Sequence, residues 1–285
     1  MEVYKGISKQ KAKQILAHSD FMIDGKPIGK HPETILFEGN ELEIISKGEV
    51  SKPQKTRGKK KPITIFYEDK YLLAALKPAG LLSCASKHDK VDYSFHKELE
   101  HFVSERDEKK TRLFICHRID REVEGILMFA KTEELQEKVK DTWPEVTKKY
   151  LALTERKPEK ESGVIQNWLR DTELQKVKEY YKEVTGSKFA KTEYRFVRQE
   201  KKYSLIEVTL HTGRKNQIRV HLSGIGCPIV GDRKYGAAAS PIRQIRLSAC
   251  SMELKHPVTG KTIEIKYQPS EQFFAPSMKE DEKYK

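Results

Sequence analysis

Short apolar stretches separated by turn residues run through most of the chain, and they predict many β-strands and few helices. Predicted strands lie at residues 63–67, 71–76, 113–115, 126–129, 149–154, 191–197, 203–210, 242–254 and 262–267. Helices are predicted at residues 89–103, 133–140 and 216–222, and the charged segment 162–188 predicts a hairpin or short helices. This mixture is typical of an α+β domain with a mixed, largely antiparallel sheet.

The N-terminal residues predict a smaller, separate part. A helix is expected at 9–18, two short strands within 21–28 around an Asp-Gly turn, and a further strand at 40–45. Residues 48–62 are rich in Lys and Arg and have almost no apolar side chain, which is typical of a flexible basic linker. The predicted organisation is a small α/β module at 1–47, the linker at 48–62, a large domain at 63–275 and a polar tail at 276–285.

One loop stands out because a carboxylate lies just before a continuous apolar strand. Residues 117–120 read His-Arg-Ile-Asp, and Ile126–Ala130 contain no polar side chain, which is typical of a strand covered on both faces. Asp120 is therefore expected in a loop held by a rigid scaffold, with Arg118 and Arg121 keeping its carboxylate ionised. Such a group can act as a nucleophile or base. On this tetrapeptide alone, a structural Arg–Asp ion pair is the better interpretation.

Charge narrows the choice of partner. The 285 residues carry a net charge of +13 and a pI of about 9.3, which favours a polyanion, most simply nucleic acid. An acidic substrate or membrane surface would suit the charge too, but no basic amphipathic anchor favours a membrane. The four cysteines are too widely spaced for a metal or redox motif, and no signal peptide or membrane span is visible. We therefore expect a cytoplasmic, monomeric protein without a metal site.

Four further segments resemble a known family. They lie at residues 66–80, 148–153, 213–222 and 231–236, the third reading Gly-Arg-Lys-Asn-Gln-Ile-Arg-Val-His-Leu. In this order, and with the His-Arg-Ile-Asp loop, they resemble the RluA-type pseudouridine synthases, which isomerise uridine in structured RNA. The resemblance covers roughly residues 63–269 and implies a central catalytic cleft in the sheet. The chain departs from the family pattern at Val123, Glu124 and Asn216, where Thr, Ser and His are usual. Glu124 is expected to raise the pKa of Asp120 by like-charge repulsion.

The resemblance also implies roles for individual residues. Asp120 would be the essential carboxylate, which either attacks the anomeric carbon or removes a proton from the sugar. Tyr150 would stack on the detached uracil and help remove the final proton, and Arg219 would pair with Asp120. Arg118 would hold the flipped nucleotide, unless it forms a salt bridge to an acid instead. The further substrate-binding residues would be His117, Arg214, Asn216 and Gln217, and the reaction would need no cofactor. Asp232 and Tyr235 are expected to fix loop structure.

The N-terminal segment resembles the small alpha-L RNA-binding module of the S-four type. Its predicted RNA contacts, together with those of the linker, are Lys9, Lys11, Lys13, Lys59, Lys60 and Lys61. The leading hypothesis is therefore an isomerase acting on ribosomal RNA, with transfer RNA as another possible substrate. One alternative is a non-catalytic RNA-binding or ribosome-assembly factor on the same fold. A carboxylate-dependent glycosidase would need a second positioned acid, for which Glu124 is the candidate.

Overall fold

The structure is a computed structural model, and it describes residues 19–23, 26–28, 42–46, 63–85, 93–172, 176–238 and 244–274. The chain divides into two compact units, residues 1–62 and residues 63–285. The first contains a three-stranded sheet with the order β2-β1-β3, in which β1 (Ser19–Ile23) is antiparallel to both β2 (Lys26–Ile28) and β3 (Leu42–Ser46). The predicted hairpin and third strand are therefore confirmed. The predicted helix, the linker and the six lysines lie outside the described residues.

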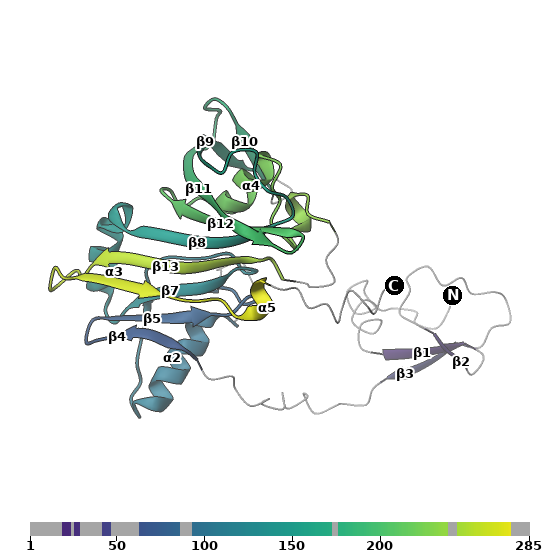
Figure 1. Ribbon diagram of the computed structural model, residues 1–285. Coiled ribbons are helices and arrows are strands. Elements are labelled where there is room, and N and C mark those ends of the chain that lie inside the picture. The colour runs from purple at the N-terminus through teal and green to yellow at the C-terminus, as the bar shows by residue number, and fades with distance from the viewer. Residues whose placement is uncertain are drawn as a thin grey trace. The chain divides into compact units, whose positions relative to one another are not determined.

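The second unit is built on an 11-stranded sheet with the main order β10-β9-β11-β12-β8-β13-β7-β5-β4 (Figure 1). Its strands are β4 (Ile65–Glu68), β5 (Leu72–Lys77), β6 (Phe114–Ile115), β7 (Glu124–Ala130), β8 (Thr147–Thr154), β9 (Ser162–Asp171), β10 (Val177–Tyr180), β11 (Lys188–Glu200), β12 (Tyr203–Leu210), β13 (Leu247–Lys255) and β14 (Thr262–Lys266). Among the described strands, β13 and β7 form the one parallel pair. The predicted mixed, largely antiparallel sheet is confirmed.

The centre of this sheet is buried on both faces. Alternate residues of β7 belong to two different hydrophobic clusters: Leu127 and Phe129 to one, Ile126 and Met128 to the other. The helix α2 (Phe95–Arg106) contributes buried side chains to the first cluster, and α3 (Glu133–Asp141) contributes to the second. The continuous apolar run therefore marks a strand covered on both sides, as its composition predicts.

The remaining elements are short. They are the helices α4 (Gln217–Gly224) and α5 (Glu271–Phe274) and the 3-10 helices η1 (Trp143–Glu145) and η2 (Arg233–Tyr235). The segment predicted as a hairpin or short helices contains the antiparallel strands β9 and β10. The helix expected from residue 89 begins later, at Phe95, because Ser94 is extended and its Oγ accepts a hydrogen bond from the Lys97 N–H at 3.5 Å.

Gly125 lies where the parallel strands β7 and β13 approach each other. Its φ is +135°, and a Cβ at this position would overlap the backbone of Ala249. Only glycine combines that φ with so close an approach. Because Gly125 is five residues after Asp120, this contact fixes where the Asp120 loop enters the sheet.

Candidate active site

A cleft of 760 Å³ lies beside the Asp120 loop. Its walls come from residues 82–84, 116–121, 123, 143, 144, 148, 150 and 210–219, with Leu247 from β13. All eight site residues that the sequence predicts in this domain line the cleft: His117, Arg118, Asp120, Tyr150, Arg214, Asn216, Gln217 and Arg219. Tertiary folding thus brings residues from distant parts of the chain into one cavity.

The Asp120 loop is held from both sides. Ser83 Oγ donates a hydrogen bond to the Ile119 carbonyl at 2.7 Å and accepts one from the Ile119 N–H at 3.1 Å. The Val123 N–H donates to the Asp120 carbonyl at 3.1 Å, which closes a turn. Asp120 keeps a side chain that is 26% exposed, so its carboxylate is fixed in place yet reachable from the cleft.

Arg219 faces Asp120 from helix α4, but its closest partner is another acid. Its Nη1 lies 3.3 Å from Asp120 Oδ2, whereas its Nε and Nη2 donate to the two oxygens of Asp232 at 2.7 and 2.9 Å. Arg219 and Asp232 are 5% and 1% exposed. The predicted Arg219–Asp120 pair is therefore present. Asp232, which was expected only to fix loop structure, also holds Arg219 in place. A bidentate pair of this kind fixes the plane of the guanidinium.

Asn216 and Tyr235 complete the support of Arg219. Asn216 has a φ of 53°, a left-handed conformation that asparagine tolerates better than most residues. Its Oδ1 accepts from Arg219 Nη1 at 3.2 Å, and its Nδ2 donates to Tyr235 Oη at 2.9 Å. The Arg219 guanidinium also lies 5.2 Å from the centroid of the Tyr235 ring. The departure from the family pattern at Asn216 thus forms part of a connected polar network.

Burial raises the pKa of Asp120 above its ordinary value, although the charge and hydrogen bond of Arg219 oppose the rise. The expectation that Arg118 and Arg121 keep this carboxylate ionised is wrong. Neither is among the main causes of the shift, which include Arg219, and the Nε of Arg121 donates instead to the Gly80 carbonyl at 3.0 Å. Arg118 is exposed and forms no ion pair with a residue that the structure describes. The salt-bridge alternative for Arg118 is therefore not observed within that part of the chain.

The neighbouring acid that raises the pKa of Asp120 is Glu122, with a further contribution from Asp232, and not Glu124 as expected. Glu122 also lies 3.5 Å from Arg219 Nη1. Glu124 instead accepts hydrogen bonds from Gln244 at 3.4 Å and from the Tyr267 hydroxyl at 3.5 Å. It therefore does not supply the second acid that a glycosidase would need beside Asp120.

Tyr150 lies on β8 between Val208 of β12 and Ala249 of β13. It is 8% exposed, and its hydroxyl has no hydrogen-bond partner among the described residues. Burial raises its pKa, and the negative charge of Asp120 adds to the rise. Tyr150 is therefore a neutral phenol at pH 7, and its charge state responds to Asp120.

Trp143 and Lys148, which the sequence did not indicate, line the cleft together with the predicted His117 and Tyr150. Trp143 stacks on His117 with ring centroids 4.7 Å apart, and Lys148 Nζ lies 5.2 Å from the Trp143 centroid. Burial lowers the pKa of Lys148 to about 8. Burial also lowers the pKa of His117 to about 3, with a smaller contribution from Lys148, and His117 Nε2 accepts from the Met128 N–H at 3.1 Å. The Lys148–x–Tyr150 spacing could have indicated Lys148, because side chains two apart share one face of a strand.

Gln217 and Arg214 shape the turn before α4. Gln217 Nε2 donates to the Lys191 carbonyl at 3.0 Å, and its Oε1 accepts from the Arg214 N–H at 3.0 Å. The Arg214 Nε donates to the Phe189 carbonyl at 2.9 Å, and its side chain is exposed. These contacts join the rim of the cleft to strand β11.

Lys77 supports the loop from below. It is fully buried, and its Nζ donates to the carbonyls of Pro78, Leu81 and Arg121 at 2.8, 2.7 and 3.2 Å. Burial lowers its pKa to about 8 despite the negative charges of Glu122, Asp120 and Glu124.

The described part of the chain contains no cluster of His, Cys, Asp and Glu that could hold a metal ion. It also contains no helix long and apolar enough to cross a membrane.

Residues 71–224, more than half of the 285 residues, match a family described as RNA pseudouridylate synthase. The chain belongs to the RNA pseudouridylate synthase family. This member is 32% identical over 215 residues to the ribosomal large subunit pseudouridine synthase C of Rickettsia felis, a match that spans 73% of this chain and 63% of that protein. It is 31% identical to the ribosomal large subunit pseudouridine synthase D of Nitrosomonas europaea, over 80% of this chain and 68% of that protein.

A solved structure shows the same fold. Human RNA pseudouridylate synthase domain containing 4 superimposes with a TM-score of 0.62 at 24% identity, and the match covers 74% of this chain and 90% of that one. The resemblance that the motifs indicate is therefore confirmed for the family and the fold. The roles of individual residues and the nature of the N-terminal unit stay predictions.

Proposed function

We propose that this protein converts specific uridines of ribosomal RNA into pseudouridine, and that the reaction depends on Asp120. The observation that carries the proposal is that Asp120, Tyr150 and Arg219 line one cleft in a member of this family. The names of its relatives in Rickettsia and Nitrosomonas favour large-subunit ribosomal RNA as the substrate. The high positive charge of the chain suits such a polyanion.

The reaction breaks the bond between uracil N1 and the ribose, rotates the base and joins its C5 to the same ribose carbon. The C5 proton leaves and N1 gains a proton, so no group is removed or added overall. Asp120 either attacks the anomeric carbon or removes a proton from the sugar. Because burial raises its pKa, the ionised Asp120 is a stronger base and nucleophile than a carboxylate in water, while Arg219 limits the rise.

Tyr150 is proposed to stack on the detached uracil. As a neutral phenol it accepts the C5 proton only if its own hydroxyl proton leaves in the same step, and the Asp120 carboxylate is the nearby base that can take it. Arg118 is proposed to hold the flipped nucleotide, since its exposed guanidinium is free to stack on a base or bind phosphate. Residues 1–62 are proposed to add RNA contacts, through an S-four-type module and the basic linker.

The test uses purified protein and transcribed large-subunit ribosomal RNA, with pseudouridine mapped at single-nucleotide resolution. We expect the wild type to form pseudouridine at defined positions and Asp120→Asn to form none, while still binding the RNA. Asp107→Asn serves as a control, because Asp107 is an exposed acid paired with Arg106 and neither residue lines the cleft. Near wild-type activity of Asp120→Asn would exclude the proposed role of Asp120. RNA binding by a wild-type protein that modifies no RNA would favour the non-catalytic alternative.

A further inference from the structure

Three aromatic residues form a row across β10, β9 and β11. Tyr180 lies opposite Trp168, and Trp168 lies opposite Phe189, in the antiparallel register of these strands. Residues directly opposite in an antiparallel pair share one face of the sheet. The Trp168 and Phe189 rings meet edge to face, with centroids 5.7 Å apart. Phe189 is 39% exposed, an unusual exposure for an aromatic side chain in a strand.

The opposite face of these strands is the covered one. Leu169, Val177 and Ala190 are buried together with Val220 of helix α4. Because side chains alternate along a strand, Trp168, Tyr180 and Phe189 point away from α4. The Phe189 side chain therefore takes no part in the packing that holds α4 on the sheet.

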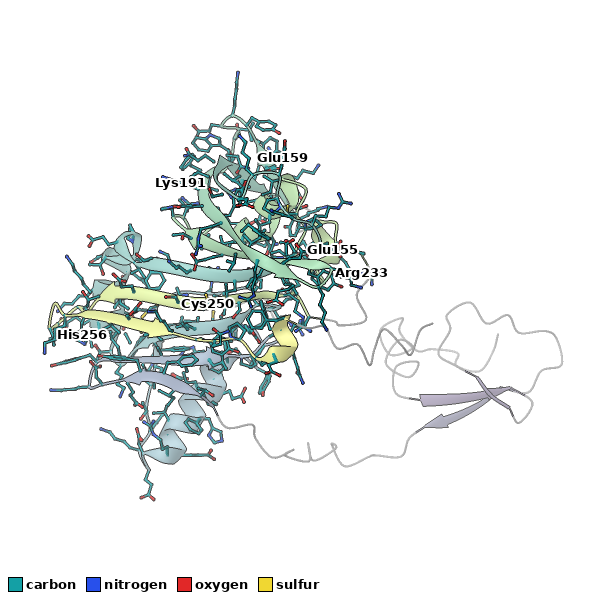
Figure 2. All side chains as sticks on the ribbon, viewed as in Figure 1. Glu155, Glu159, Lys191, Arg233, Cys250 and His256 are labelled. Atoms are coloured by element: carbon teal, nitrogen blue, oxygen red, sulfur yellow. The ribbon has the colours of Figure 1, made fainter. Side chains whose placement is uncertain are left out.

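Cations flank the aromatic row on both sides of the same face. On one side, Lys178 lies two residues before Tyr180, and Arg170 lies two residues after Trp168. Lys178 and Arg170 are directly opposite each other. Lys191 lies opposite Gln166, on the other side of the row. Figure 2 labels Lys191 among the side chains of this part of the sheet. These positions are roughly 7 Å from the row, since a strand rises about 3.3 Å per residue. The Arg170 guanidinium lies 5.0 Å from the centroid of the Tyr180 ring.

The row and the cleft use opposite faces of the sheet and come together at the start of β11, where Thr192 on the α4 face lies opposite Leu210 of the cleft wall. Arg214 lines the cleft, and its Nε donates to the Phe189 carbonyl at 2.9 Å. Gln217, also in the cleft wall, donates to the Lys191 carbonyl. An RNA strand that leaves the cleft past Arg214 would therefore pass around the start of β11 to reach the Phe189 ring on the other face.

We propose that the face formed by Tyr180, Trp168 and Phe189 binds single-stranded RNA adjacent to the target uridine, by stacking bases on the aromatic rings. Lys178, Arg170 and Lys191 then contact the phosphates. The inference rests on the proposed action on RNA and names the surface that holds the flanking strand. Aromatic side chains bordered by cations bind single strands with little sequence preference, because every base has a π-face.

Tryptophan fluorescence reports on this face directly, because the chain contains only two tryptophans, Trp143 and Trp168. In a Trp143→Phe background, Trp168 is the single emitter. The probe is an eight-nucleotide oligoadenylate, which stacks well and contains no uridine that the cleft could isomerise. We expect its binding to quench Trp168 and to weaken as salt rises.

Two substitutions at Phe189 separate stacking from packing. Phe189→Leu should weaken the binding of oligoadenylate by roughly tenfold, because it removes one stacking partner. Phe189→Tyr keeps the ring and should bind within about twofold of the parent. Unchanged urea midpoints would show that each variant is folded. Lys191→Gln should lower the salt dependence of binding, and Lys138→Gln, on the exposed face of α3, should not.

Failure of this inference and failure of the proposed function are distinguishable. Oligoadenylate that binds without quenching Trp168, or equal binding by Phe189→Leu and Phe189→Tyr, would overturn the aromatic face while leaving uridine isomerisation intact. If the protein forms no pseudouridine but oligoadenylate quenches Trp168 as expected, the proposed function is refuted and the RNA-binding face is supported.

Discussion

Asp232→Asn tests how Arg219 is held. The Asp232 carboxylate accepts hydrogen bonds at 2.7 and 2.9 Å from Arg219, and neither side chain is more than 5% exposed. Removing one charge from a buried, hydrogen-bonded pair costs about 3–5 kcal/mol, because the other charge stays buried without that partner. Of its ion pairs with described residues, Arg219 would keep only the longer ones to Asp120 and Glu122, at 3.3 and 3.5 Å. Asparagine keeps one oxygen acceptor, so we expect the free energy of unfolding to fall by about 3 kcal/mol, near the lower end of that range.

Asp171→Asn is the matched control. Asp171 pairs with Lys215 at 2.8 Å, a similar distance, but the two side chains are 56% and 51% exposed. Exposed ion pairs contribute about 0–1 kcal/mol, so this change should be nearly silent. Urea unfolding of both variants at one pH measures the difference. Equal losses in the two variants would refute the idea that burial makes the Arg219–Asp232 pair stabilising.

Asp232→Asn should also move the pH dependence of the reaction. The charge of Asp232 raises the pKa of Asp120, so its removal should lower that pKa. Because the proposed reaction needs the ionised carboxylate, the acid limb of kcat/KM should move to lower pH in Asp232→Asn. Arg219→Gln should move it to higher pH, because Arg219 holds that pKa down. Shifts in the same direction for both variants would contradict this account of the site.

Three other measurements follow from the structure and the charge pattern. Tyr150→Phe should bind RNA normally but turn over roughly 10²–10⁴-fold more slowly, since its ring remains and its hydroxyl is removed; wild-type turnover would reduce Tyr150 to stacking. Deleting residues 1–61 should leave a folded domain whose salt slope of RNA affinity falls by roughly 0.7–0.9 for each phosphate that the shortened protein no longer binds; an unchanged slope would exclude this segment from RNA binding. Burial lowers the pKa of His221 to about 4 in the folded protein, whereas a histidine in the unfolded chain has a pKa of about 6.5. As the pH falls, the unfolded chain therefore takes up a proton at His221 before the folded protein does, and stability falls. This loss should be about 2 kcal/mol between pH 7 and pH 5, and it should be absent from the pH dependence of His221→Gln unfolding.

The strand pattern was predictable because side chains that alternate with a period of two record which face of a sheet is buried. The unbroken apolar run in β7 indicated burial on both faces, and residues 72–77 and 147–154 also lie where apolar patterning predicts strands. The start of α2 was missed although Ser94 is a good N-cap, because the apolar spacing continues before it. The motifs determined the family, since each combines a particular side chain with a fixed local spacing.

The electrostatics of Asp120 could not be predicted from its neighbours in sequence. Arg118 and Arg121 are adjacent to it in the chain, yet the cation that acts on it is Arg219, 99 residues away. Asp232 in turn fixes Arg219, and both are buried. The sequence by itself determined most of the strands, the basic charge and eight of the residues that line the cleft. Only the tertiary structure decided which charges face each other and how much water they lose, because a pKa depends on distances and burial that folding creates between remote segments.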